Sequence, residues 1–204
     1  MAYNVQLLCS NLARRGFIAS YFNTAEEASS YVCSIIGGGS TIGIGGSMTV
    51  KEMGLIDRLA GDGNKVYCHA LAKADKIEDT YKKAAKAQYY ISSANALTYD
   101  GEIVNIDGAG NRVSALIYGV PHIIYVIGIN KITDNIDSAI KRVRNVASPA
   151  NTRRLNKKTP CAVTGVCSYC NSPDCICNVT TIMHHPMRRQ QSVHVVLIGE
   201  SLGY

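Results

Sequence analysis

The sequence has no apolar run long enough to cross a membrane and no recognisable export signal. Its apolar stretches fall short of the roughly 18 residues that a membrane-spanning helix needs. The opening residues, MAYNVQLLCSNLARRGF, lack the basic start, apolar stretch and small-residue cleavage site of a secretory signal. We therefore expect a cytoplasmic protein without membrane insertion. In the cytoplasm, thiols are kept reduced.

Repeats, low-complexity segments and nucleotide-binding signatures are also missing. The glycine-rich segment STIGIGGSMTVKEMGL, which begins at Ser40, has neither the G-x-G-x-x-G spacing of dinucleotide sites nor the Gly-Lys-Ser/Thr ending of a P-loop. The net charge of +6 comes from basic residues spread along the chain, without the interleaved aromatic residues or docking motif of a nucleic-acid-binding surface. We therefore expect neither a nucleoside triphosphate site nor a nucleic acid partner.

What the sequence does contain is enough apolar material for one domain. Its 204 residues are 47% hydrophobic and 18% charged, and a chain of this length can bury about 70% of its unfolded-state surface. Strands are expected at 16–22, 40–44, 65–68, 88–93, 122–129, 178–183 and 193–200, and helices at 4–15, 24–36, 49–60, 73–87, 110–119 and 134–147. This alternation predicts a single α/β domain over residues 1–204, with a doubly wound and largely parallel sheet.

The glycine-rich segment joins an expected strand to an expected helix. Gly43, Gly45 and Gly46 precede Ser47, and the helix begins near Thr49. Glycines let the backbone approach a ligand closely, and the free amides of a helix N-terminus favour an anion, so this junction could bind a phosphate or a carboxylate. A tight turn capped by Ser47 explains the same residues, and the spacing alone leaves both interpretations open.

A second polar segment, Asn95-ALTYDGEIVNIDGAGNRVSA, is expected to form a hairpin at 95–108 followed by a helix. Its polar side chains could face one crevice at the carboxyl ends of the strands, although Asn-Gly and Asp-Gly pairs often make only turns. From this segment Asn95, Asn111 and Arg112 are candidate anion ligands. Glu102, Asp107, Arg112 and Lys131, which follows the strand at 122–129, are candidate catalytic residues.

Five of the eight cysteines lie close together near the C-terminus. They are Cys161, Cys167, Cys170, Cys175 and Cys177, within the Cys-rich segment 159–178, and Pro149 and Pro160 are expected to bracket the passage into it. Thiols at this density bind a metal ion, bind an iron–sulfur cluster or form cross-links. The remaining three, Cys9, Cys33 and Cys68, have apolar neighbours and are expected in the core.

Several blocks together resemble the LUD (lactate utilisation) domain family. They are Gly43-IGGSMTVKEMGL, Asn95-ALTYDGEIVNIDGAGNRVSA, Gly128-INKI, RVRNVASPANTRRL at 142–155 and TPCAVTGVCSYCNSPDCICN at 159–178. The resemblance implies a Rossmann-like three-layer fold similar to ribose-5-phosphate isomerases, glucosamine-6-phosphate deaminases and CoA transferases. It also implies a part in oxidising lactate to pyruvate beside iron–sulfur partner proteins.

The resemblance ranks the cysteines as well. The family pattern matches Cys161, Cys167, Cys170 and Cys177 as four metal ligands, whereas the position of Cys175 is commonly basic. Four thiolates suit a [4Fe-4S] cluster or tetrahedral zinc, and the spacing does not choose between these and an empty thiol set.

Two classes of function follow. In the first, the protein is a redox or electron-transfer component whose cysteines hold an iron–sulfur cluster and whose crevice binds a small anionic metabolite such as a 2-hydroxy acid. In the second, it is an isomerase or CoA transferase-type enzyme with a structural zinc or thiol site, which would need a carboxylate in the crevice. A zinc-stapled binding module is a third interpretation, and the sequence does not give the oligomeric state.

Overall fold

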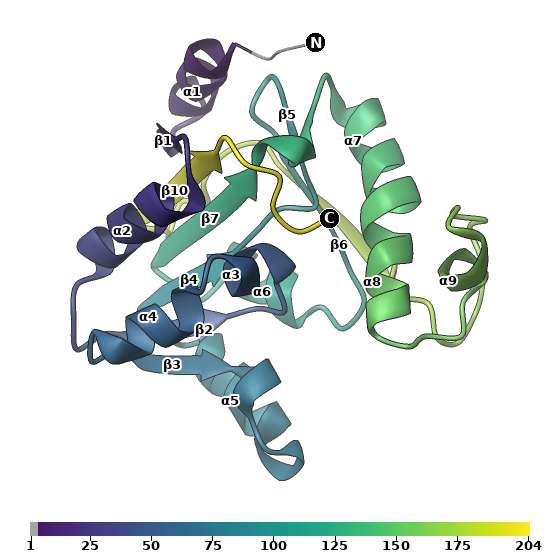
Figure 1. Ribbon diagram of the computed structural model, residues 1–204, viewed down its shortest axis with the longest axis horizontal. Coiled ribbons are helices and arrows are strands. Elements are labelled where there is room, and N and C mark those ends of the chain that lie inside the picture. The colour runs from purple at the N-terminus through teal and green to yellow at the C-terminus, as the bar shows by residue number, and fades with distance from the viewer. Residues whose placement is uncertain (1–3) are drawn as a thin grey trace.

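Six parallel strands form the main sheet of the computed structural model, which describes residues 4–204 (Figure 1). In spatial order they are β1 (Ile18–Phe22), β10 (Ser192–Ile198), β7 (His122–Gly128), β4 (Tyr89–Ser92), β2 (Thr41–Ile44) and β3 (Lys65–Cys68). Every neighbouring pair runs parallel. The central strand β7, HIIYVIG, is buried along nearly its whole length, as a parallel strand covered on both faces must be.

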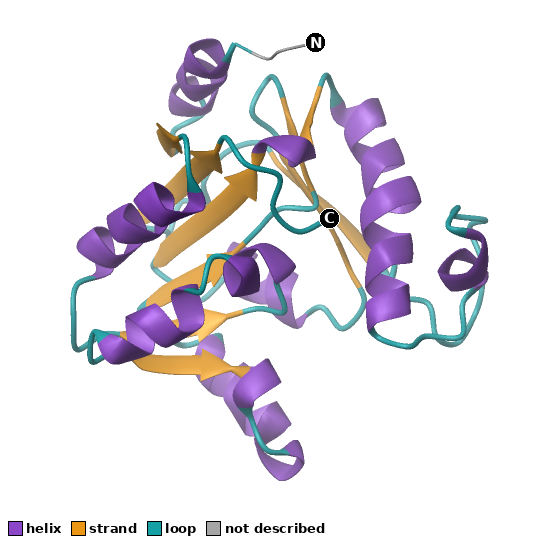
Figure 2. Ribbon diagram, in the orientation of Figure 1, coloured by secondary structure: helices purple, strands orange, loops and turns teal. Residues whose placement is uncertain are grey.

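Helices cover both faces of this sheet, so the predicted Rossmann-like three-layer α/β fold is confirmed (Figure 2). One face packs against α1 (Val5–Arg14), α5 (Ile77–Ala84) and α6 (Asn111–Ile117), and the other against α2 (Ala25–Ile36), α3 (Met48–Glu52) and α4 (Leu55–Gly61). Along β7, Tyr125 faces the first cluster whereas Ile124 and Val126 face the second. This alternation of side chains gives the domain a core on each side of one sheet.

A second, smaller sheet lies beside the first. Its spatial order is β8 (Ile132–Thr133), β5 (Ala96–Thr98), β6 (Ile103–Asp107) and β9 (Val179–Met183). The expected hairpin is present as the antiparallel pair β5–β6, and Gly101 adopts a φ of 94° in its turn. The last two expected strands lie in different sheets. β9 belongs to this smaller sheet, whereas β10 lies between β1 and β7 in the main sheet.

Two expected helices differ from the structure. The helix expected at 49–60 is divided into α3 and α4, because Gly54 adopts a left-handed φ of 64° between them. The helix expected at 134–147 runs further: α7 (Ile136–Arg142) passes through a π-helical turn, Val143–Ala147, into α8 (Ser148–Arg154). Pro149 therefore does not end the helix, since it lies at the start of α8, after a π turn that changes the hydrogen-bonding register.

The Cys-rich segment 159–178 begins shortly after the end of this long helix at Arg154. Figure 1 shows α7 and α8 as one column beside the sheets, with α9 (Pro160–Thr164) outside it. Between α9 and β9 the chain forms a loop without helix or strand. The short 3₁₀ helices η1 (His69–Leu71), η2 (Ala74–Lys76) and η3 (Ile129–Lys131) complete the described elements. Within residues 4–204, no helix is both long enough and apolar enough to span a bilayer; residues 1–3 of the expected domain lie outside the described part.

Candidate functional site

A pocket of about 500 Å³ opens at the carboxyl ends of the parallel strands. Gly46 and Ser47 follow β2, Ser93 and Asn95 follow β4, and Lys131 follows β7, and all five line it. The strand β2 leads outward to β3, whereas β4 leads the other way to β7 and β10. The pocket therefore lies at the topological switch point of the sheet, where open α/β sheets bind their ligands.

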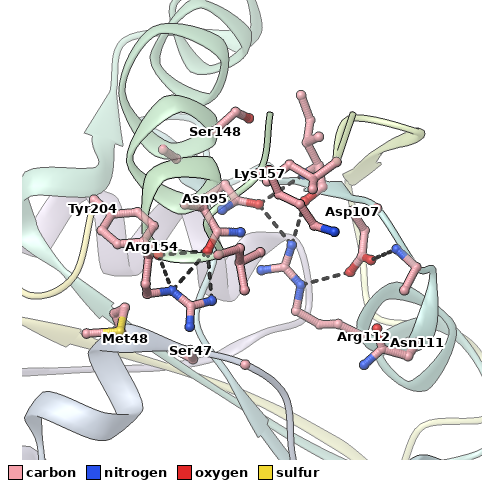
Figure 3. Close-up of a pocket in the computed structure, with 18 of the residues that line it drawn as sticks. Ser47, Met48, Asn95, Asp107, Asn111, Arg112, Ser148, Arg154, Lys157 and Tyr204 are labelled. Carbon is pink, nitrogen blue, oxygen red and sulfur yellow. Dashed lines mark hydrogen bonds and ion pairs between the residues drawn. The ribbon is translucent and has the colours of Figure 1, made fainter. Parts of the chain in front are cut away.

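Arg112 is held rigidly at the centre of the pocket (Figure 3). Its Nε donates to Asp107 Oδ2 at 3.1 Å, and its Nη2 donates to Asn95 Oδ1 at 3.0 Å and to the Ile106 carbonyl oxygen at 2.6 Å. Nη1 has no protein partner among residues 4–204. The guanidinium is thus fixed by its neighbours and keeps two N–H groups for a ligand.

Asp107 positions this arginine and its turn. While Oδ2 accepts from Arg112, Oδ1 accepts from the backbone N–H groups of Ala109 at 3.1 Å and Gly110 at 2.8 Å. Both carboxylate oxygens are therefore occupied at the start of α6. The sequence left open whether these polar residues form a turn or line a crevice. In the structure they do both, because the turn orients Arg112 toward the pocket.

Lys131 is buried in the wall of the pocket, with 4% of its surface exposed. Its Nζ donates to Thr49 Oγ1 at 2.8 Å and to Ser93 Oγ at 3.0 Å. Among the described residues it forms no salt bridge with a carboxylate. Burial, with smaller contributions from the positive charges of Arg142 and Arg112, lowers the pKa of Lys131 to about 7.

Helix α8 and the chain after it supply a second set of cations that the sequence did not predict. The Nε of Arg154 donates to the Tyr204 hydroxyl at 2.9 Å and to Asn151 Oδ1 at 3.2 Å. Lys157 forms an ion pair with Asp174 at 3.8 Å. The pocket wall therefore holds four basic side chains against two acidic ones, Asp107 and Asp174, and this balance favours an anionic ligand.

The glycine segment contributes less to the pocket than its composition suggests. Gly46 and Ser47 line it, and Ser47 caps α3 by accepting from the Val50 N–H at 3.3 Å. Gly43 and Gly45 are needed for packing instead: a Cβ on Gly43 would lie 2.4 Å from the Ala84 carbonyl oxygen, and one on Gly45 would lie 3.0 Å from the Tyr90 hydroxyl.

Two other candidates lie behind the pocket or away from it. Thr49 is fully buried and acts on the pocket through its contact with Lys131. Glu102 does not line the pocket, because the hairpin β5–β6 carries it toward α1, where it pairs with Arg15 and accepts from Thr98. Asn111, by contrast, lines the pocket as expected.

A second cavity, of about 200 Å³, is lined by all five cysteines of the segment. Cys167 Sγ accepts hydrogen bonds from the Arg144 guanidinium at 3.7 Å and from the Tyr169 N–H at 3.5 Å. Cys161 Sγ lies 3.3 Å from the Thr159 hydroxyl. All eight cysteines of the chain, each within the described part, are free thiols.

The thiols that line this cavity are not drawn together around a single point. In residues 4–204, no group of three or more His, Cys, Asp or Glu side chains is placed to hold one metal ion. Tetrahedral zinc needs sulfurs roughly 4 Å apart, since each lies about 2.3 Å from the ion. A [4Fe-4S] cluster binds each thiolate through a different iron and spaces them more widely. Five thiols around one cavity are chemically suited to either group, and their arrangement does not choose between the two.

The two cavities are neighbours. Ser148, Cys175 and Ile176 line both of them, and the Cys177 thiol donates to the Ser148 hydroxyl at 3.4 Å. The Cys-rich loop therefore forms part of the wall of the cationic pocket. The sequence did not predict that the Cys-rich loop would border the pocket, because Cys175 departs from the family pattern and α8 was not expected.

The layers, the switch-point pocket and the adjoining thiol cavity define a Rossmann-like α/β domain in which a cationic pocket lies beside a cluster of thiols. The chain belongs to the LUD domain family, whose family model matches residues 5–198. The likeness read from the quoted blocks is thereby confirmed, and it extends over nearly the whole chain.

Among solved structures, the chain is similar to a DUF162 family protein from Deinococcus radiodurans, with a TM-score of 0.56 and 10% identity over 95% of each chain. A similarity to eIF2B beta from Chaetomium thermophilum has a TM-score of 0.39 and 14% identity, over 56% of this chain and 44% of that one. At 10% identity the likeness to the Deinococcus radiodurans protein concerns the fold alone. A search of curated proteins found no match.

Proposed function

We propose that this LUD-domain protein is a redox or electron-transfer component of 2-hydroxy acid utilisation, with lactate as the type of metabolite that it serves. The pocket would bind the small carboxylate, and the cysteine cavity would hold a [4Fe-4S] cluster. The observation that carries the proposal is the placement of all five clustered cysteines around one cavity that shares a wall with the cationic pocket. Family membership is consistent with this role.

The cluster ligands would be Cys161, Cys167, Cys170 and Cys177. When bound, the cluster would accept or donate one electron at a time. Arg144 and the Tyr169 N–H already donate to Cys167, and hydrogen bonds to a ligating sulfur raise the reduction potential of such a centre. Cys175 would stay a free thiol on the wall between the two cavities.

The carboxylate would bind to Arg112. Its Nη1 is the group left without a protein partner in the described chain, and its other nitrogens are anchored by Asp107, Asn95 and the Ile106 carbonyl. Arg154 adds positive charge from α8. A carboxylate on a pre-oriented guanidinium forms a charge-assisted hydrogen bond, and its affinity suffers little from reorganisation of the side chain.

Oxidation of a 2-hydroxy acid to a 2-oxo acid releases two electrons and two protons. These electrons need an acceptor, and the family resemblance implies a role beside iron–sulfur partner proteins. The chain is therefore proposed to work with a redox partner rather than alone.

The isomerase or CoA transferase alternative is less well supported. Both reactions need a carboxylate that can act on the substrate. Glu102 lies outside the pocket in an ion pair with Arg15, and both oxygens of Asp107 are engaged. Asp174, the other carboxylate of the pocket, pairs with Lys157 and accepts from the Lys158 N–H.

Metal analysis of anaerobically purified protein tests the proposal. We expect brown protein that absorbs in the visible sulfur-to-iron region and contains iron and acid-labile sulfide. Cys167→Ser should lose both, whereas Cys175→Ser and the distant control Cys33→Ser should keep them. Colourless protein with stoichiometric zinc would overturn the cluster, and equal iron loss in all three variants would overturn the ligand assignment.

A further inference from the structure

We propose that Lys131 is a carbonyl-reactive amine that captures a 2-oxo acid in the switch-point pocket as a reversible imine. This inference rests on the proposed function only in taking the pocket to bind a small carboxylate. It adds a covalent activity toward the oxidised form of the metabolite, and it assigns that activity to a side chain outside the cysteine cavity.

The first observation is the way in which the Nζ is held. Two hydroxyls lie within hydrogen-bond distance, Thr49 Oγ1 at 2.8 Å and Ser93 Oγ at 3.0 Å. A neutral amine has two N–H groups and one lone pair, so donation to both hydroxyls leaves the lone pair without a protein partner among residues 4–204. The nitrogen is then an oriented nucleophile on a residue that lines the pocket.

The second observation is the electrostatic setting. Lys131 is 4% exposed, and within residues 4–204 no carboxylate forms a salt bridge with it. Arg142 and Arg112 are both close enough to disfavour its ammonium form, and the opposing effect of the Glu52 carboxylate is smaller than either. An amine in a desolvated site next to other cations is the arrangement in which lysine becomes nucleophilic near neutral pH.

The third observation is the spacing to the anion-binding group. Ser93 contacts Lys131 and Asn95 contacts Arg112, and two residues of extended chain span at most about 7 Å. The amine and the guanidinium therefore flank one short segment at the end of β4. A 2-oxo acid carries its carboxylate on the carbon next to its carbonyl, and both basic residues line the same pocket, so the proposal places the carboxylate on Arg112 and the carbonyl carbon toward the amine.

The step balances without an oxidant or a cofactor. The nitrogen lone pair forms the N–C bond, and the carbonyl π pair moves to oxygen. The two protons of the amine pass to that oxygen, which leaves as water, and the C=N bond remains. The Thr49 and Ser93 hydroxyls donate their own protons to the Leu202 and Ala94 carbonyl oxygens at 3.2 Å and 3.4 Å, so both hydroxyls accept from the amine and hold it in place.

Reductive trapping tests the proposal. The full chain is incubated anaerobically with pyruvate and sodium cyanoborohydride near pH 8, and the product is analysed by mass spectrometry of the intact protein and its peptides. We expect one adduct with the mass of a reduced pyruvate imine, located on the peptide that contains Lys131. Lys131→Arg, which keeps the charge, and Lys131→Met should each remove it, whereas the exposed-site control Lys51→Arg should not.

A second probe separates site chemistry from general lysine reactivity. Acetone has the carbonyl but not the carboxylate, so it should label Lys131 at least about 10-fold less than pyruvate, the loss of one charge-assisted contact. Adducts spread over surface lysines, and equal in wild type and Lys131→Arg, would overturn the proposal. Wild-type peptide mapping decides the question even if neither variant folds.

The proposed function is tested independently on the same preparations. Iron content and lactate binding by calorimetry report on the cluster and on the carboxylate site. If both are present and no adduct forms on Lys131, the imine proposal fails alone. If the adduct forms without iron or lactate binding, the redox proposal fails and the amine chemistry stands.

Discussion

Replacing Lys131 with methionine should change how the stability of the protein depends on pH. In the unfolded chain a lysine keeps its proton up to about pH 10.5, whereas in the folded protein burial lowers the pKa of Lys131 to about 7. Between these values the unfolded state binds more protons, so the free energy of unfolding of the wild type rises with pH. Lys131→Met should lack this pH dependence, because methionine does not bind a proton.

The magnitude follows from the size of the shift. Each pH unit in which only the unfolded state is protonated adds about 1.4 kcal/mol. Because the folded group is still half protonated at pH 7, the difference in unfolding free energy between wild type and Lys131→Met should grow by about 2 kcal/mol from pH 7 to pH 9. The loss of folding stability caused by burying the ammonium is fully present below pH 7 and declines as the pH rises above 7.

Urea unfolding at pH 7, 8 and 9, under reducing and anaerobic conditions, measures this difference. Thiol and histidine titrations occur in both proteins and cancel in the comparison. The exposed Lys51 of α3 provides the control, since Lys51→Met should show a difference that is flat with pH. A flat difference for Lys131→Met as well would refute the reasoning that the Lys131 ammonium is destabilised by burial.

Three further changes test the fold and the pocket. Gly43→Ala should lower the free energy of unfolding by at least about 2 kcal/mol, because the new Cβ would lie 2.4 Å from the Ala84 carbonyl oxygen; Gly61→Ala, with open space around it, should be neutral or stabilising in the same urea titration. Arg112→Ala should weaken lactate binding about 10-fold or more in calorimetry while iron content is unchanged, and equal affinity would remove Arg112 from the site. Thr24→Ala should cost about 1 kcal/mol in thermal unfolding through loss of the capping box of α2.

The sequence predicted helices and strands correctly where their boundaries depend on interactions between residues close together in the chain. The capping box of Thr24 and Glu27 fixes the start of α2, and it depends only on residues three apart. The buried run at 122–129 became β7, since a continuous apolar segment of that length suits a strand covered on both faces. The π turn before Pro149 was not predicted, because it depends on how the helix packs against the second sheet.

The candidate site was predicted only in part, and the reasons differ from residue to residue. The pocket is lined by Asn95, Asp107, Asn111, Arg112 and Lys131, because each ends or follows a strand or opens a helix near the carboxyl ends of the main sheet. Glu102 occupies an equally polar position in sequence, but its hairpin turns it toward Arg15. Arg154 could not have been predicted, since only the continuation of the helix through Pro149 brings it to the pocket.

Periodicity, turn residues and ordered motifs are properties of neighbouring residues, so they were enough to predict the class of fold, the family and the cluster of five thiols. Which of these motifs meet depends on contacts between elements far apart in the chain. The tertiary structure placed the Cys-rich loop against the switch-point pocket, so that Cys175 and Ile176 border both cavities. It also buried Lys131 beside two arginines, and the low pKa of that amine arises from desolvation and charge proximity across elements far apart in the chain.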